Sequence, residues 1–402
     1  MILRRGACPG LANPMPTGDG LLARLAVARA IPLESFAALC AAAQTHGNGI
    51  MEITSRGSFQ VRGLTERSAP AFAATVEALD IADAADGRVL ASPLAGLDPN
   101  EIVDVSGVAD RLREGLVERD LPAKLAPKFS IIVDGGGSLH LDATPCDIRM
   151  RAEMINGATR FHVTLANEST DEITTPERVV ETVLELLHAI AAYGPTARAR
   201  DLLPLSTSVR AGNTRPARVA TQPIGIHRLR DGVAIGIALP FGHSDATTLN
   251  EVSKEARLAG AIAARPGPGR VLLLIGVAPA QASTLVAKTG QLGFITKADD
   301  PRRRVFACVG APACASAQIP TRGLAPAIAA AAYIDGQTIH VSGCPKGCAH
   351  PAAADLTIVG VDGKCAIVPN GRAQDAPVEL VTVDDLPKYL ARHEAVREVA
   401  HG

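Results

Sequence analysis

Two kinds of hydrophobic spacing follow one another along the chain, and together they predict a mixture of strands and helices. Residues 21–43 combine a strand-like apolar segment, a proline-containing turn and an amphipathic helix, and residues 233–256 have the same order. Residues 176–194 have apolar positions at helical spacing, with Pro176 in the first turn and Gly194 after the end. We therefore predict an α+β fold.

The similarity between the first two segments is part of a wider internal repeat. Residues 88–91 correspond to 304–307, and residues 126–128 correspond to 344–346, so that the offset drifts from 212 through 216 to 218. A slow drift in one direction is typical of a diverged duplication with small insertions, although two unrelated α/β segments could also match this weakly. The duplication predicts two halves related by a pseudo-twofold axis, with a cleft between them.

Residues 198–223 separate the two halves. They are rich in Pro, Arg, Ser and Thr and show neither helical nor alternating spacing, which predicts a linker or an extended crossing segment. Within each half, a portion with two strands and two helices precedes a second α/β portion. We place the first portions at residues 1–95 and 216–305, and the second portions at residues 96–215 and 306–402.

Composition excludes several classes of protein. The formal net charge is −1, and the chain has 8 Phe, 3 Tyr and no Trp, so we expect no nucleic-acid partner and no membrane partner. The sequence has no apolar run long enough for a membrane span, and its first 20 residues lack the apolar core of a secretory signal. We therefore expect a cytoplasmic protein with reduced cysteines.

Polar and apolar residues alternate between Glu52 and Arg62. The polar positions carry Arg56 and Arg62 together with Thr54 and Gln60, while Ile53, Phe59 and Val61 occupy the other face. A strand from residue 54 to residue 62 would extend about 26 Å at about 3.3 Å per residue, which suits a large ring with acidic side chains. The alternative is a solvated strand face.

Four of the eight cysteines are scattered, at positions 8, 40, 146 and 365, whereas the other four lie close together. Their pattern is Cys308-x5-Cys314, then 29 residues, then Cys344-x3-Cys348. Structural zinc sites usually have a shorter spacing within each pair. A [4Fe-4S] cluster is wider and accepts cysteines from two loops of small residues, so the pattern favours a cluster over zinc or unligated thiols.

This spacing, together with the sequence GCPKGC, resembles the cluster motif of the sulfite and nitrite reductase family. The resemblance extends over nearly the whole chain. It implies a duplicated sulfite/nitrite reductase-like architecture, in which each half has a ferredoxin-like portion and a larger α/β portion. It also implies that Cys308, Cys314, Cys344 and Cys348 hold a [4Fe-4S] cluster, with Cys348 closest to a tetrapyrrole.

Other segments resemble ligand-binding segments of the same family. Residues 54–63, TSRGSFQVRG, resemble its tetrapyrrole-binding strand, and this favours binding over a solvated face. Arg24 in LLARL and Lys128 in LAPKFS match cations that surround a small anion in the reductases. The resemblance thus implies that the tetrapyrrole is bound by Arg24, Thr54, Arg56, Gln60, Arg62 and Lys128.

The small-anion site itself departs from the family pattern. Ser130 stands where a second lysine is expected, and Gly87 stands where an arginine is expected, with Arg88 beside it. Loss of two positive charges from a site of low dielectric constant weakens the binding of an oxyanion. The sequence therefore favours a tetrapyrrole substrate over sulfite or nitrite.

The N-terminal segment RRGACPGLANPMPTGDGLLARL forms, at the least, a compact turn before a strand. It also resembles the family branch that acts in aerobic cobalamin biosynthesis. That resemblance implies a monooxygenase that hydroxylates precorrin-3A at C20 with closure of a γ-lactone. The partners are then O2 and an external reductant, either an NAD(P)H-linked reductase or a ferredoxin-like donor.

Two other functions remain open, namely a sulfite or nitrite reductase with bound sirohaem and a non-catalytic electron-transfer or tetrapyrrole-binding protein. A mononuclear non-haem iron beside the cluster is also open, and no catalytic side chain is assigned. His350 either binds such an iron or caps the local fold. Arg149 and Arg151 either meet substrate acids or form a solvated edge, and residues 302–304 either dock an electron donor or form a solvated loop.

Overall fold

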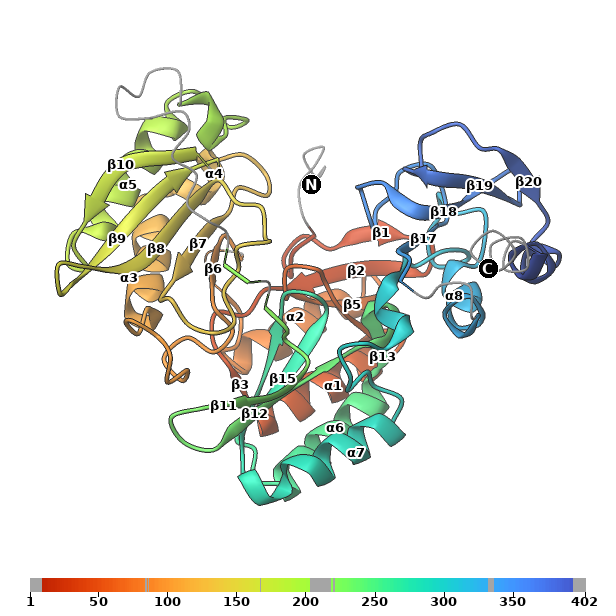
Figure 1. Ribbon diagram of the computed structural model, residues 1–402, viewed down its shortest axis with the longest axis horizontal. Coiled ribbons are helices and arrows are strands. Elements are labelled where there is room, and N and C mark those ends of the chain that lie inside the picture. The colour runs from red at the N-terminus through yellow and green to blue at the C-terminus, as the bar shows by residue number, and fades with distance from the viewer. Residues whose placement is uncertain are drawn as a thin grey trace, which may run out of the picture.

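In the residues that the structure describes, the strands form four five-stranded sheets (Figure 1). The structure is a computed structural model, and it describes residues 9–83, 85, 87–166, 168–202, 218–219, 221–331 and 336–392. Most of the predicted linker and Cys8 lie outside these residues. Within the described residues, no helix is both long and apolar enough to cross a membrane.

Two of the sheets share one core, in the lower part of Figure 1. The first has the order β1-β2-β5-β4-β13 and the other the order β11-β12-β15-β14-β3, so each takes its last strand from the other half of the chain. The strands of the first sheet are β1 (Met15–Thr17), β2 (Gly20–Leu25), β5 (Phe59–Leu64), β4 (Ile50–Ile53) and β13 (His243–Asp245). Those of the other are β11 (Gly225–Arg228), β12 (Val233–Ala238), β15 (Val271–Val277), β14 (Ala263–Gly267) and β3 (Ile31–Pro32).

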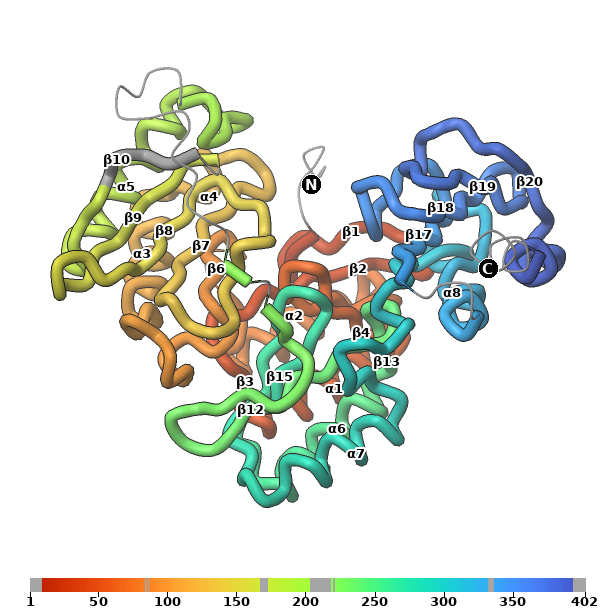
Figure 2. Tube along the Cα trace, viewed as in Figure 1, coloured from red at the N-terminus to blue at the C-terminus, as the bar shows by residue number. Residues whose placement is uncertain are grey.

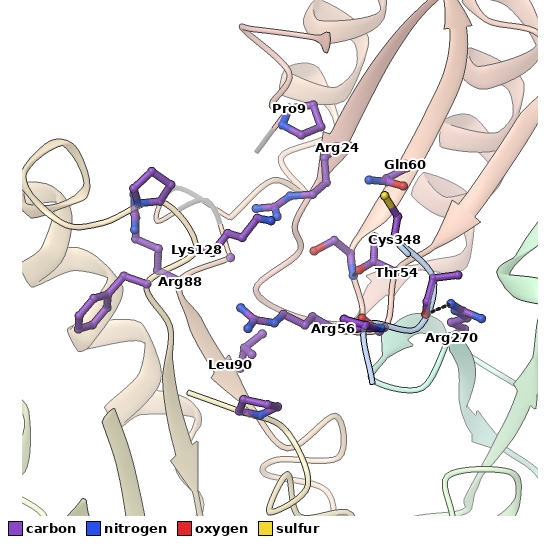
Figure 3. Close-up of a pocket in the computed structure, with 18 of the residues that line it drawn as sticks. Pro9, Arg24, Thr54, Arg56, Gln60, Arg88, Leu90, Lys128, Arg270 and Cys348 are labelled. Atoms are coloured by element: carbon purple, nitrogen blue, oxygen red, sulfur yellow. Dashed lines mark hydrogen bonds between the residues drawn. The ribbon is translucent and has the colours of Figure 1, made fainter. Parts of the chain in front are cut away.

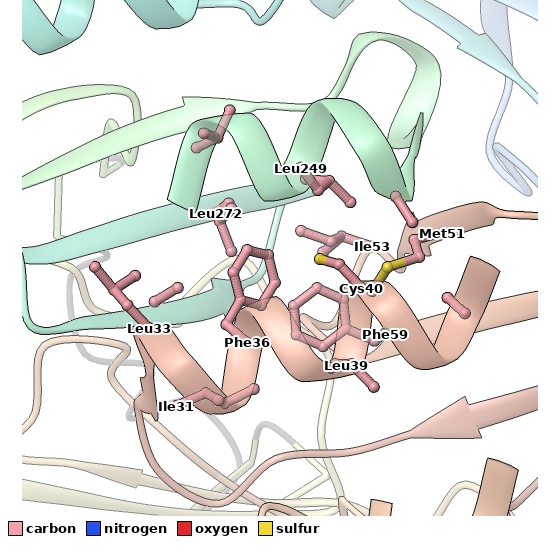
Figure 4. Packing of buried hydrophobic residues seen from close by; sticks show 14 of the residues in the cluster. Ile31, Leu33, Phe36, Leu39, Cys40, Met51, Ile53, Phe59, Leu249 and Leu272 are labelled. Atoms are coloured by element: carbon pink, nitrogen blue, oxygen red, sulfur yellow. The ribbon is translucent and has the colours of Figure 1, made fainter. Parts of the chain in front are cut away.

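The helices of this unit explain why the exchange of strands is stable. Helix α1 (Leu33–His46) packs against α6 (Ala246–Leu258), and Figure 2 shows β13 beside β4. The two remaining helices are α2 (Ser68–Ala78) and α7 (Ala282–Gln291). Phe36, Phe59, Leu249 and Leu272 are buried in one continuous cluster that contains side chains of both halves (Figure 4). Burial of this shared apolar surface joins the halves.

The other two sheets stand apart, each with its own core. Both begin with three parallel strands and end with antiparallel pairing. The earlier sheet contains β6 (Val89–Ala91), β7 (Ile131–Asp134), β8 (Ile148–Ile155), β9 (Ala158–Leu165) and β10 (Glu168–Thr174). The later sheet contains β16 (Val305–Ala307), β17 (Ile339–Ser342), β18 (Ala354–Val361), β19 (Lys364–Gly371) and β20 (Glu379–Val381). Their helices are α3 (Ser106–Glu118), α4 (Leu121–Lys124), α5 (Val179–Ala191) and α8 (Thr321–Ala330).

The matching strand orders confirm the predicted α+β class and the duplication. Strand β12 and helix α6 repeat β2 and α1, and β16 repeats β6. One predicted correspondence is wrong, because residues 126–128 precede β7 whereas residues 344–346 follow β17. The predicted boundaries also differ from the sheets, since β6 ends before residue 96 and β16 begins at Val305. A short sequence match does not show whether the matched segment lies before or after a strand.

Candidate functional site

A cavity of about 1070 Å³ lies between the first sheet, the N-terminal ends of β6 and β7, and the loop after β17. Its volume lies just above the usual range for ligand pockets, which is about 300–1000 Å³. The described residues that line it include no Asp or Glu, but they include five cations, which are Arg24, Arg56, Arg88, Lys128 and Arg270. This excess of positive charge favours a large ligand with several acidic groups.

The turn that presents Arg56 corrects the predicted single strand. Residues 52–62 form a hairpin, in which β4 and β5 pair with Glu52 opposite Gln60. The turn closes through hydrogen bonds from Thr54 N to the Ser58 carbonyl at 2.9 Å and from Ser58 N to Thr54 Oγ1 at 3.0 Å. Gly57 has a φ of +80°, which other residues rarely adopt. The chain therefore folds back and carries Arg56 at the tip of the hairpin.

The second half of the chain holds this tip in place. Gly269 N donates to the Ser55 carbonyl at 3.0 Å, and Arg56 forms a bridge with Pro268. A Cβ atom on Gly57 would lie 2.8 Å from the carbonyl carbon of Gly267, so only glycine fits here without a shift of the backbone. Contact between the two halves thus fixes the position of Arg56 in the cavity wall.

Other predicted binding residues reach the same cavity from different strands. Arg24 on β2 lies opposite Gln60 on β5, and both line the cavity, as does Thr54. Figure 3 shows Arg24, Lys128 and Arg56 extending into one open space, which Cys348 also borders. The structure therefore brings together Arg24, Thr54, Arg56, Gln60 and Lys128, and their roles in binding stay predictions.

Gly87 and Arg88 both line the cavity, next to Lys128. Arg88 donates to the carbonyls of Ala126 at 3.0 Å and Pro122 at 2.8 Å, so its guanidinium supports the segment that leads to Lys128. Lys128 has a φ of 63°, an unusual value for a residue with a side chain. A Cβ atom on Gly87 would lie 2.8 Å from Ala26 Cβ, so an arginine does not fit at this position without rearrangement.

Arg62 does not line the cavity, unlike the other predicted binding residues. Its residue is only 3% exposed, and its guanidinium donates to Asp19 and to the carbonyl of Ala313. Although burial lowers its pKa, the hydrogen bond to Asp19 and the nearby Glu52 carboxylate raise the pKa overall. The prediction placed Arg62 with Arg56 because both occupy even positions, but the hairpin turn separates them.

The four clustered cysteines occupy two neighbouring loops. Cys308 and Cys314 follow β16, and Cys344 and Cys348 follow β17, which pairs with β16. Burial raises the pKa of the Cys348 thiol, and the thiols of Cys344, Cys308 and Cys314 raise it further. The four thiols therefore lie near one another, and Cys348 alone among them lines the cavity.

Small residues surround these thiols. Gly343 N donates to Cys308 Sγ at 3.1 Å, and a Cβ atom on Gly343 would lie 2.5 Å from Ala317 Cβ. A backbone N–H that points at a sulfur is typical of iron–sulfur sites. Among the described side chains, no three His, Cys, Asp or Glu residues are grouped so as to hold a single metal ion.

Two of the five cavity cations, Arg88 and Arg270, were not among the predicted binding residues, and Arg270 was missed because the prediction assigned the binding cations to the first half. Its Nη2 donates to the Ala349 carbonyl at 3.3 Å, next to Cys348. Its guanidinium carbon lies 5.5 Å from the centre of the Phe306 ring, and this ring stacks on His350 at 4.7 Å. The internal repeat could have indicated Arg270. It directly precedes β15, just as Ser58, a residue of the predicted polar face, directly precedes the corresponding strand β5.

The residues with two open interpretations now have positions. Arg149 is buried and donates to the carbonyls of Leu141 and Thr144, which makes it part of the local fold. Arg151 lies 3.7 Å from Glu153, and neither arginine lines the cavity. Arg302 donates to Asp300 and to the carbonyl of Gly293, and Arg303 donates to the carbonyl of Ala298. His350 lines the cavity, with Nε2 3.3 Å from the Ala353 carbonyl.

Comparison with known families starts from the shared core. Residues 13–79 match the model of the nitrite/sulfite reductase ferredoxin-like half domain. These residues include β1 to β5, α1 and α2, and therefore the hairpin that carries Arg56. The match bears out the predicted ferredoxin-like portion at the start of the chain.

Three known proteins are similar to this chain over most of its length. A protein of Sinorhizobium sp. named precorrin-3B synthase is 37% identical over 97% of this chain and 88% of its own length. The ferredoxin–nitrite reductase of Synechococcus elongatus is 23% identical over 77% of this chain and 70% of its own length. The solved structure of the Mycobacterium tuberculosis NirA protein has a TM-score of 0.73 and 18% identity, and it covers 92% of this chain and 80% of that chain.

The similar structure and the similar sequences answer different questions, namely the fold of the chain and its branch within the family. The likeness to NirA confirms the predicted sulfite/nitrite reductase-like architecture. The higher identity and nearly complete coverage of the Sinorhizobium protein separate the cobalamin branch from the more distant nitrite reductase. The chain belongs to the precorrin-3B synthase family, within the wider nitrite and sulfite reductase family.

Proposed function

We propose that this protein is the precorrin-3B synthase of a cobalamin pathway. In this reaction, precorrin-3A is hydroxylated at C20 and a γ-lactone closes from the ring A acetate. One atom of O2 enters the product, and the other leaves as water with two electrons and two protons from an external reductant. The observation that carries the proposal is 37% identity to a precorrin-3B synthase over 97% of the chain.

The cationic cavity supports this substrate. Precorrin-3A carries acetate and propionate groups around its ring, and arginine binds carboxylates with two parallel hydrogen bonds. Arg56 reaches the cavity from the hairpin tip, Arg24 from β2 and Lys128 from the segment before β7. Cations on three separate elements can hold a ring in one orientation. Since the meso carbons are chemically similar, orientation selects C20.

We also propose that Cys308, Cys314, Cys344 and Cys348 hold a [4Fe-4S] cluster. The small-residue loops, the Gly343 N–H on Cys308 Sγ and the mutual effect of the thiols on the pKa of Cys348 support this donor set. A bound cluster would supply electrons one at a time beside the cavity. The role of this chain is to hold the thiols next to the ring-binding cations. A mononuclear non-haem iron stays a hypothesis without assigned ligands.

Turnover tests the proposed function. Anaerobically purified protein is mixed with precorrin-3A and a chemical reductant, and the product is analysed by mass spectrometry after exposure to ¹⁸O2. We expect one ¹⁸O atom in the product and no product without O2 or without reductant. Unchanged precorrin-3A under all conditions, with cluster and substrate both present, would exclude the synthase.

The nitrite reductase similarity makes the sirohaem-containing reductase the second candidate. Purified protein that retains stoichiometric sirohaem absorption and reduces sulfite or nitrite would favour it. The buried Ser130 and the crowded Gly87 argue against it, because neither offers a cation to a small anion. A carrier without catalysis is excluded by any turnover of precorrin-3A.

A further inference from the structure

A network of four charged side chains, two of them buried and two half-buried, lies beside the row of cavity-lining residues on the first sheet. Arg62 Nε and Nη2 donate to the two carboxylate oxygens of Asp19 at 2.9 Å each. Arg62 Nη1 lies 3.5 Å from Glu52 Oε1, and Arg322 Nη2 donates to the same oxygen at 2.7 Å. Two guanidiniums thus balance two carboxylates, so the loss of either arginine leaves the network with a net negative charge.

The network also holds the loop that carries Cys314. Arg62 Nη2 donates to the Ala313 carbonyl at 2.9 Å, and Gly18 N donates to the same carbonyl at 3.1 Å. A Cβ atom on Gly18 would lie 2.4 Å from the Pro312 carbonyl oxygen, so the two backbones approach as closely as glycine allows. The turn before β2 and the loop after β16 are therefore joined through Arg62 and its partner Asp19.

Arg62 lies close enough to Cys314 for their charges to interact. Arg62 Nη2 donates to the carbonyl of Ala313, which directly precedes Cys314, so the guanidinium charge lies beside this proposed cluster ligand. A bound cluster becomes more negative when it accepts an electron. A fixed positive charge near one of its ligands therefore makes the reduction more favourable, and burial of Arg62 strengthens this effect.

We propose that Arg62 is a positioning residue, which fixes the Cys314 loop against the first sheet and raises the reduction potential of the cluster. This inference rests on the proposed cluster, and it concerns residues that do not line the cavity. It also gives Arg62 a role, although this residue of the predicted polar face does not line the cavity. The guanidinium is used on the cluster loop instead of on the substrate.

The test is a potentiometric titration with dithionite, followed by electron paramagnetic resonance. We expect Arg62→Gln to keep most of its iron and sulfide but to lower the equilibrium constant for one-electron reduction about threefold to tenfold. A tenfold change corresponds to about 59 mV. The dissociation constant for precorrin-3A should change less than about twofold, which a substrate-binding residue would not allow.

Two more variants separate charge from loop geometry. The double variant Arg62→Gln with Glu52→Gln removes one charge of each sign, so the midpoint potential should return most of the way to that of the unmodified protein. Arg62→Lys keeps the charge but loses the paired hydrogen bonds to Asp19, so we expect an altered resonance spectrum with a smaller change in potential. If Arg62→Gln fails to fold, Arg62→Lys still tests the proposal, because an unchanged resonance spectrum and an unchanged potential in that variant would overturn it.

Arg149→Gln is the matched control. Arg149 is also buried, and it also donates to loop carbonyls, but its loop in the first repeat has none of the four cluster cysteines. Its substitution should lower stability without any change in the potential. An unchanged potential in both Arg62→Gln and Arg62→Lys would overturn this inference alone, whatever the turnover. Protein that turns over no precorrin-3A but shows the expected shifts would overturn the synthase assignment alone.

Discussion

The loops after β7 and β17 occupy the same place in the two repeats, but they are held in opposite ways. The first, residues 135–147, is closed by charges of the chain itself: Asp147 pairs with Arg198 at 2.7 Å, and Arg149 donates to three loop carbonyls. The second, residues 343–353, has no Asp or Glu, but it carries Cys344 and Cys348. The first loop is therefore closed by ion pairs and hydrogen bonds of the chain itself, whereas we expect the proposed cluster to add bonds to the second loop through its thiols.

The sharpest way to break this comparison is Cys344→Ser. A serine hydroxyl is a poor ligand for iron, so we expect nearly complete loss of the roughly four iron and four sulfide atoms per chain of a [4Fe-4S] cluster. Metal and acid-labile sulfide analysis of anaerobically purified protein measures this. Cys365→Ala is the control, because Cys365 is buried in β19 outside the two cysteine loops, and it should keep its iron. Full iron content in Cys344→Ser would remove that ligand from the assignment.

The matching experiment on the first loop is Asp147→Asn. The carboxylate is 4% exposed and accepts hydrogen bonds from Arg198 at 2.7 and 2.8 Å and from Ser130 N at 3.0 Å. An amide leaves the guanidinium without its charge partner, so we expect a loss of about 3–5 kcal/mol in the free energy of unfolding. Urea denaturation measures it. Asp120→Asn, at an exposed pair with Lys124, should cost less than about 1 kcal/mol.

Iron content gives that experiment a second use. If the two loops are held independently, Asp147→Asn should keep its iron while losing stability. A variant that loses iron along with stability would show that the ion pairs of the first repeat also support the cysteine loops, and the comparison would then have to be abandoned.

The hairpin shows how far the sequence alone could lead. Alternation correctly identified which residues share a face, since Glu52 and Gln60 lie directly opposite one another and opposed residues point the same way. The alternation also hides the turn. Residues 54–58 reverse the chain between β4 and β5, and because their number is odd, the polar residues still fall on even positions after the turn. Only Gly57, with its positive φ, marks the reversal, and a single glycine is a weak turn signal. The pattern therefore predicted the polar face but not the fold-back.

The remaining errors came from long-range contacts. The partners of Arg62 are Asp19, 43 positions away, and the carbonyl of Ala313, 251 positions away, and no local pattern reports either. Arg270 likewise enters the cavity wall only because the exchanged strands bring the halves together. The cysteine spacing, in contrast, is a local signal for each pair. It led to four thiols that do lie near one another.

Substitution of a cavity cation tests whether the first repeat binds the ring. For Arg56→Ala we expect precorrin-3A binding to weaken by about 1.5–3 kcal/mol, or roughly 10- to 150-fold in the dissociation constant, because one charged hydrogen-bonding partner is lost. Equilibrium titration under anaerobic conditions measures it. Arg67→Ala removes an exposed arginine at the start of α2 and should leave the affinity unchanged. An unaltered dissociation constant in Arg56→Ala would mean that the hairpin tip does not bind the ring and that Arg56 is only solvated.

The strand exchange allows a finer test, through acid titration of His243. This residue lies on β13, which the second half lends to the first sheet, and burial together with the Arg322 charge lowers its pKa to about 4. In the unfolded chain His243 takes up a proton near pH 6.5, whereas in the folded protein it stays neutral until the pH is near 4. The contribution of His243 to the free energy of unfolding is therefore complete above pH 6.5 and is lost as the pH falls towards 4. We expect His243→Gln to remove about 1–2 kcal/mol of the decline in unfolding free energy between pH 6.5 and 4.5, since glutamine does not titrate. His188→Gln, at an exposed site on α5, should leave the decline unchanged. Identical pH profiles for His243→Gln and the unmodified protein would mean that the junction between the repeats accepts a charge as readily as the solvent does.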